Sequence, residues 1–198
     1  GGREIEILIN EVLENFNFKK PYESISNLLK IYQKIKKIKD THIKDLKIKE
    51  LSEIIINCLG LEIQFNSKKS YGIPESYIDV EFKLYNPSPI NVSIKKIELN
   101  NFNINDISLK NKKILSIEKK IKIPNKFTAP FWLLGKKTDG NYFVEDFKIK
   151  GNPETTHPLK SIFSIKVDDV LIKIEKELKY RYNDPVKGEV IEKFEIYP

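Results

Sequence analysis

The sequence predicts a mainly β protein with an α-helical N-terminal part: an antiparallel β-sandwich preceded by about three helices. Two observations carry this prediction. Apolar residues recur with a helical period through the first third of the chain, and from Leu61 onward they alternate at every second residue. Of the 198 residues, 40% are hydrophobic and 11% are aromatic, which is enough to form a core.

Three amphipathic helices are expected within residues 1–60. The first covers residues 3–17, and its apolar stripe comprises Ile5, Leu8, Ile9, Val12, Leu13 and Phe16. Pro21 can open the second, whose stripe comprises Ile25, Leu28, Leu29, Tyr32 and Ile35. Asp40-Thr41 supplies a candidate cap for the third, with Leu51, Ile54, Ile55, Cys58 and Leu59 inward. Gly60 fits the left-handed position that ends it.

The remaining residues predict a series of short strands. The clearest covers residues 77–85, with Ile78, Val80, Phe82 and Leu84 on one face. Further strands are expected at residues 61–65, 92–99, 104–109, 114–123, 142–149, 162–167, 170–182 and 190–196, with Asp168-Asp169 as a tight hairpin turn. Strands at this spacing, without helices between them, indicate an antiparallel sandwich. We therefore expect a helical lead-in at residues 1–60, packed without a flexible linker on a β-sandwich domain at residues 61–198.

Composition narrows the class of protein. The net charge is +7, but there are 33 lysines and only two arginines, Arg3 and Arg181, whereas nucleic-acid binders use arginine heavily. We therefore expect no nucleic-acid partner. No apolar run approaches the roughly 20 residues that span a bilayer, so no membrane span is expected. Absence of Met, with Gly1-Gly2 as a probable tag remnant, predicts a piece of a longer protein.

No residue set predicts catalysis. His42 and His157 lie in different parts of the chain, outside any metal-ligand spacing, and both are expected at the surface. The single cysteine, Cys58, lies in an apolar helical stretch and is expected to be a core thiol. Glu145-Asp146 would point to opposite faces of a strand. We predict no catalytic residue, no metal site and no cofactor in this chain.

Trp132 is the one tryptophan, and it lies in the phrase Pro130-Phe131-Trp132-Leu133. Core packing between two sheets is the favoured interpretation, because large aromatic side chains fill sandwich cores well. The alternative is a stacking surface for a sugar ring or a partner. If they are exposed, Trp132, Phe131 and Tyr142 are the candidate ligand-binding residues.

Four stretches in order resemble a known family. They are residues 28–32 with 46–61, which end in Cys58-Leu59-Gly60-Leu61; residues 73–88; residues 123–133; and residues 180–189 with 197–198. Together they resemble the region after the catalytic domain in long bacterial deacetylases of the PIG-L/LmbE type (GlcNAc-PI de-N-acetylase-like). That family usually has Pro-Tyr-Trp-Leu where this chain has Pro-Phe-Trp-Leu.

The resemblance implies a parent enzyme that hydrolyses N-acetylated sugars with zinc held by a His-Pro-Asp-Asp phrase. Here His157-Pro158 is followed by Leu159-Lys160, so no catalytic or metal residue carries over. We therefore expect a non-catalytic accessory domain with an immunoglobulin-like sandwich, whose partner is its own upstream catalytic domain and which gives structural support or places substrate. The compartment is unknown, and export of the parent follows only from the family's usual substrates.

Two alternatives remain open. The first is a carbohydrate-binding sandwich with an aromatic stacking face, for which Trp132 would have to be exposed. The second is an enzyme in its own right, which would need a polar pocket containing His42 or His157 with a partner group.

Overall fold

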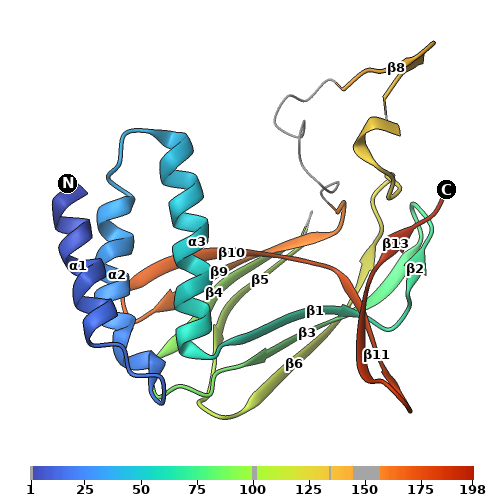
Figure 1. Cartoon of the computed structure of the whole chain (residues 1–198). Coiled ribbons are helices and arrows are strands. Elements are labelled where there is room, and N and C mark those ends of the chain that lie inside the picture. Colours follow the sequence, from blue (N-terminus) through green and yellow to red (C-terminus); the bar gives the residue numbers. More distant parts are fainter. Residues whose placement is uncertain (1, 100–101, 134, 145–156) are drawn as a thin grey trace. The chain divides into compact units, whose positions relative to one another are not determined.

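The computed structural model describes residues 2–99, 102–133, 135–144 and 157–198. Helices form the N-terminal part and strands the rest, as the sequence predicts (Figure 1). The chain forms two compact units, each assembled from three separate segments. Unit 1 comprises residues 1–64, 82–117 and 161–176, and unit 2 comprises residues 65–81, 118–160 and 177–198. The predicted domain boundary after Gly60 stays a prediction.

The helices of unit 1 are α1 (Gly2–Glu14), the 3-10 turn η1 (Pro21–Ser24), α2 (Ile25–Ile35) and α3 (Thr41–Leu59). The predicted cap of α3 is confirmed, because the Asp40 carboxylate accepts a hydrogen bond from the Ile43 N–H at 3.0 Å. Gly60 ends α3 with a left-handed φ of 62°, also as predicted. None of these helices is long and apolar enough to cross a membrane.

Burial differs among the three helices. The predicted stripe of α2 is buried, together with Ile31. Helix α1 packs on α2 but has no buried residue, and its Ile9 and Leu13 stay exposed. In α3 the predicted inward position of Ile54 is wrong, because its side chain is exposed, whereas Leu51, Ile55 and Leu59 are buried.

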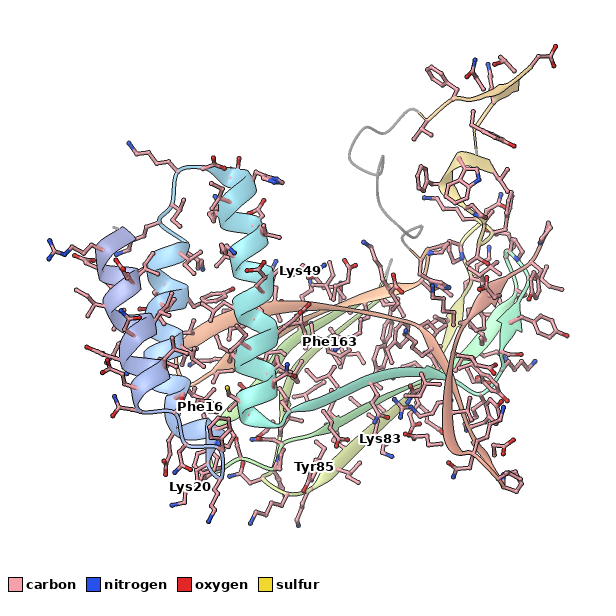
Figure 2. All side chains as sticks on the ribbon, in the orientation of Figure 1. Phe16, Lys20, Lys49, Lys83, Tyr85 and Phe163 are labelled. Atoms are coloured by element: carbon pink, nitrogen blue, oxygen red, sulfur yellow. The ribbon has the colours of Figure 1, made fainter. Side chains whose placement is uncertain are left out.

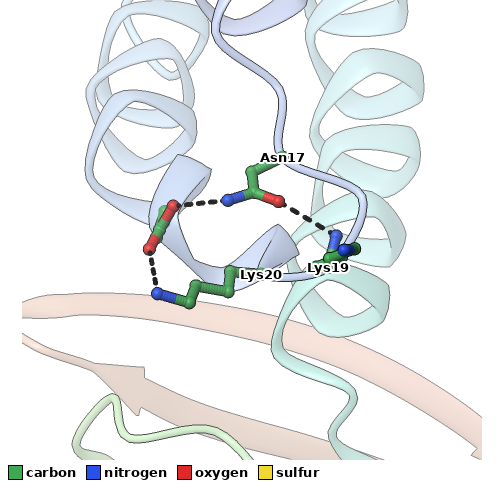
Figure 3. Close-up of polar contacts among 4 residues, drawn as sticks. Asn17, Lys19 and Lys20 are labelled. Atoms are coloured by element: carbon green, nitrogen blue, oxygen red, sulfur yellow. Dashed lines mark hydrogen bonds and ion pairs between the residues drawn. The ribbon is translucent and has the colours of Figure 1, made fainter.

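The link between α1 and η1 explains why α1 ends at Glu14 rather than at the predicted residue 17. The Asn17 side chain accepts a hydrogen bond from the Lys19 N–H at 3.0 Å and donates one to the Glu23 carboxylate at 3.1 Å (Figure 3). Lys20 pairs with the same carboxylate at 3.5 Å. This local network offers the backbone an alternative to a further helical turn.

The strands form two larger and two smaller sheets. The five-stranded sheet has the order β12 (Gly188–Lys193), β11 (Lys179–Asp184), β1 (Glu62–Ser67), β3 (Tyr77–Tyr85), β6 (Ile114–Lys122). The four-stranded sheet has the order β10 (Val170–Glu177), β9 (Lys160–Val167), β4 (Val92–Leu99), β5 (Phe102–Ser108). The small sheets pair β2 (Tyr71–Gly72) with β13 (Glu195–Ile196), and β7 (Lys137–Thr138) with β8 (Asn141–Tyr142). The β1–β11 pair is parallel, so the five-stranded sheet is mixed rather than purely antiparallel as predicted, and the small β2–β13 sheet is parallel.

The alternation predicted for β3 is confirmed, since Ile78, Val80, Phe82 and Leu84 are all buried. Within unit 1, Phe82 of β3 meets Phe163 of β9, which is labelled in Figure 2, edge to face with ring centroids 6.0 Å apart. Neither side chain has any exposed area. This contact joins a strand of the five-stranded sheet to one of the four-stranded sheet in the core of unit 1.

Two predicted strands are each divided. The stretch 170–182 breaks at Leu178 into β10 and β11, which belong to different sheets, and the Leu178 N–H donates to the Leu159 carbonyl. The stretch 190–196 breaks at Phe194 into β12 and β13. The Asp168-Asp169 turn between β9 and β10 is confirmed. Of the strand expected at 142–149, residues 145–149 lie outside the described residues.

Candidate functional site: an aromatic surface on unit 2

Trp132 is not a core residue. It lies in the short 3-10 turn η2 (Phe131–Leu133), and the residue is 39% exposed to solvent. The favoured core-packing interpretation is therefore wrong, because Pro130 is followed by a helical turn rather than by a strand that alternates between two faces. Phe131 is half-buried and meets the Trp132 ring edge to face at 5.0 Å. Tyr142 is exposed, on the separate β7–β8 sheet.

A second aromatic pair is formed by Tyr71 of β2 and Tyr197, the residue directly after β13. Tyr71 and Tyr197 have ring centroids 5.7 Å apart, and each is more than half exposed. The parallel pairing of β2 with β13 places them together, and the Tyr197 N–H donates to the Gly72 carbonyl at 3.0 Å. The sequence does not predict this pair, because no local pattern indicates pairing between residues so distant in the chain.

Thr128 joins the segment that leads to Trp132 to β13, the strand that directly precedes Tyr197. Its N–H donates to the Ile196 carbonyl at 2.9 Å, and its hydroxyl accepts from the Ile196 N–H at 3.0 Å. The same hydroxyl donates to the Glu195 carboxylate. Phe127, next to Thr128, is exposed as well. We call the exposed side chains on these three joined segments the aromatic surface; they are Tyr71, Phe127, Trp132 and Tyr197.

A buried histidine bonds to the backbone at the residue that precedes β13. His157 is only 8% exposed, so the prediction of a surface histidine is wrong. Its Nδ1 accepts from the Leu159 N–H at 3.0 Å, and its Nε2 therefore carries the proton and donates to the Phe194 carbonyl at 2.6 Å. Because Phe194 directly precedes β13, the imidazole fixes the chain at the point where that strand begins.

Close packing at Gly72 holds the same region. A Cβ on Gly72 would lie 2.3 Å from Ile123 Cδ1 and 3.0 Å from Phe194 Cζ, so only glycine fits without a shift of its neighbours. Ile123 and Phe194 are both buried. Tyr71, next to Gly72 in the chain, therefore lies beside closely packed side chains, which favours a defined arrangement of the Tyr71–Tyr197 pair.

Two charged grooves each contain an ion pair. One, of about 330 Å³ in unit 2, is lined by Lys68, Asp79, Val80, Glu118, Lys119 and Lys120. Its Lys68–Glu118 pair, 2.8 Å apart, lowers the pKa of Glu118 and raises that of Lys68, so both stay charged at neutral pH. The other, of about 380 Å³ between α1 and α2, contains the Glu4–Lys34 pair, which lowers the pKa of Glu4.

The remaining candidates for chemistry lie apart from one another. His42 is exposed on α3. Cys58 is half-buried, and burial raises the pKa of its thiol, which keeps it protonated and a poor nucleophile. Within the described ranges, no group of three or more His, Cys, Asp or Glu side chains could hold a metal ion.

Comparison with known proteins assigns no family. No family model matches the chain, and no curated protein matches it. Among solved structures, it is similar to the alkylpurine DNA glycosylase AlkC of Pseudomonas fluorescens bound to DNA containing an abasic site analogue. That match has 10% identity and a TM-score of 0.28, and it covers 87% of this chain and 50% of that one. A TM-score this low supports no inference about fold or function.

Proposed function

We propose that this chain is a non-catalytic accessory domain that binds carbohydrate on its aromatic surface and places it for an enzyme. The exposure of Trp132 carries the proposal, since a tryptophan held at the surface beside Phe131 offers a ring face to a ligand. Aromatic rings provide a large apolar contact area at low conformational cost. The C–H faces of sugar rings match such a flat apolar contact.

The second aromatic pair supports the same class of ligand. Tyr71 and Tyr197 each combine an apolar ring with a hydroxyl that donates and accepts hydrogen bonds. A sugar ring likewise presents apolar faces and a rim of hydroxyl groups. A surface of exposed rings with polar tips suits this chemistry better than it suits a wholly apolar ligand, which would favour an enclosed cavity.

The proposal also includes the kind of enzyme to which this chain would be joined. The stretches at residues 28–32 with 46–61, 73–88, 123–133, and 180–189 with 197–198 resemble the region after the catalytic domain of PIG-L/LmbE-type deacetylases. On that basis the zinc site and the hydrolysis of N-acetylated sugar belong to an upstream catalytic domain, and this chain contributes substrate placement. We also propose an immunoglobulin-like sandwich, which the edge-to-face contact of Phe82 with Phe163 supports.

The test uses the fluorescence of Trp132, which is the one tryptophan of the chain. Titration of the whole chain with neutral tetrasaccharides, N-acetylated and not, should change its emission saturably. Isothermal titration calorimetry should give the same affinity, and Trp132→Ala should abolish the binding heat.

Phe18→Ala is the matched control, because Phe18 is a strongly exposed aromatic residue on unit 1. Its variant should bind as the unchanged chain does. Unchanged emission and no binding heat with any sugar would contradict the carbohydrate proposal. Release of acetate from an N-acetylated sugar by the chain alone would contradict the non-catalytic proposal.

A further inference from the structure

Beside the aromatic surface, the described side chains outside ion pairs carry an excess of positive charge. Three lysines lie on the segments that carry it: Lys69 two residues before Tyr71, Lys126 next to Phe127, and Lys136 after η2. All three side chains are exposed, and among the residues that the structure describes none of their ammonium groups has an ion-pair or hydrogen-bond partner.

The acids on the same segments are already engaged. The Glu195 carboxylate accepts from the Thr128 hydroxyl. Glu75 forms an ion pair with Lys122, which raises the pKa of that lysine. Within residues 67–75, 124–133, 135–136 and 194–198, the charged side chains outside ion pairs are therefore three lysines and one carboxylate, Glu195, so the charge that faces a ligand is net positive.

We infer that the carbohydrate bound by the aromatic surface is anionic, an oligosaccharide carrying carboxylate or sulfate groups. This inference rests on the proposed function, and it adds the charge of the ligand. Stacking on Trp132 and the Tyr71–Tyr197 pair supplies contact with the rings. Exposed lysines add an attraction that is modest for each pair and strongest at low salt, because exposed charges are screened.

The test compares two tetrasaccharides of equal length, a tetragalacturonate and a neutral tetraglucoside, by Trp132 fluorescence and calorimetry. At about 0.01 M ionic strength the anionic sugar should bind about tenfold more tightly than the neutral one. The advantage should shrink several-fold at about 0.15 M, where the screening length falls from about 30 Å to about 8 Å.

Variants separate this attraction from general positive charge. The triple change K69Q/K126Q/K136Q should reduce the affinity for the anionic sugar to that for the neutral one, with neutral binding unchanged. The matched control K39Q/K110Q/K113Q removes three exposed lysines from unit 1 and should leave the preference within about twofold.

Three outcomes would overturn the inference. Equal affinity for the two sugars at low salt would do so while leaving carbohydrate binding intact. An equal loss of preference in both triple variants would also do so, because it would assign the preference to net charge. Failure of both sugars to bind would overturn the inference and the proposed function together.

Discussion

The two units use their aromatic side chains in opposite ways. Unit 1 contains 23 of the 32 buried apolar side chains that the structure describes, including Phe82 and Phe163. Unit 2 contains nine, yet it carries seven of the eight exposed aromatic side chains in the described ranges. Single exposed apolar residues are ordinary, but a cluster of them marks a contact surface. Unit 1 thus holds most of the buried core that the structure describes, and in the proposed function the exposed rings of unit 2 present the ligand surface.

The largest expected difference in stability is between variants of one aromatic residue from each unit. Phe163→Ala should lower the free energy of unfolding by about 3–5 kcal/mol, because it leaves a cavity against Phe82. Trp132→Ala should lower it by less than about 1 kcal/mol, since that ring is partly exposed. Urea denaturation measures both values. An equal loss would mean that Trp132 stabilises unit 2 as a core residue does.

A smaller loss of stability is expected when the buried histidine of unit 2, His157, is replaced. His157→Ala would leave the Phe194 carbonyl and the Leu159 N–H unpaired in a buried place, at a cost of roughly 1–3 kcal/mol. His42→Ala, at an exposed histidine of unit 1, should change stability by less than about 0.5 kcal/mol. Denaturant titrations of the two variants give the comparison. Similar losses would show that the His157 contacts do not support unit 2.

Gly72→Ala should destabilise unit 2 by about 1 kcal/mol, because the new Cβ overlaps Ile123 Cδ1. The cost is at the low end for overpacking, since that atom is the end of a flexible side chain. Gly2→Ala is the control, as nothing lies within 4 Å of a Cβ there. Thermal unfolding of both variants checks this prediction, and a neutral Gly72→Ala would show that the base of the aromatic surface is loosely packed.

The smallest effect concerns acid conditions. The Val186 and Lys187 N–H groups donate to Asp184 at 2.8 Å, and these bonds lower the pKa of its carboxyl group. Because the pKa of Asp184 is lower in the folded chain than in the unfolded chain, where it is about 3.9, its ionised carboxylate stabilises the fold fully at pH values above the unfolded pKa. That stabilisation is lost as the pH falls through the folded-state pKa. Asp184→Asn should therefore be less stable than the unchanged chain at pH 7, by an amount that shrinks near pH 3. A constant difference across this range would contradict the assignment.

Local features of the fold could be predicted from the sequence. The Asp40 cap, the Gly60 helix end and the alternation in residues 77–85 depend on neighbouring residues, and all three are confirmed. The division of residues 170–182 could not be predicted, because β10 and β11 continue one alternating pattern while pairing with different strands. Pairing partners lie far away in the chain, and no periodicity encodes them.

The candidate site could be predicted from the sequence only in part. Trp132 stood out because it is the one tryptophan, but its exposure depends on the turn that follows Pro130. His157 is buried by a residue 37 positions away, Phe194, so its loop-like neighbours gave the wrong expectation. Tyr71 and Tyr197 meet only because β2 pairs with β13.

The segmented make-up of unit 1 has a consequence during synthesis. Its helices are complete once residue 64 has been made, but its last segment, which supplies most of β9 and β10, ends at Lys176. At about 5–20 residues per second, the ribosome needs roughly 6–22 s to add the residues between. Throughout that interval the apolar stripe of α2 and the inner face of α3 lack β9 and β10, the last strands of their own unit. The nascent chain should therefore depend on chaperone protection until its final segments emerge.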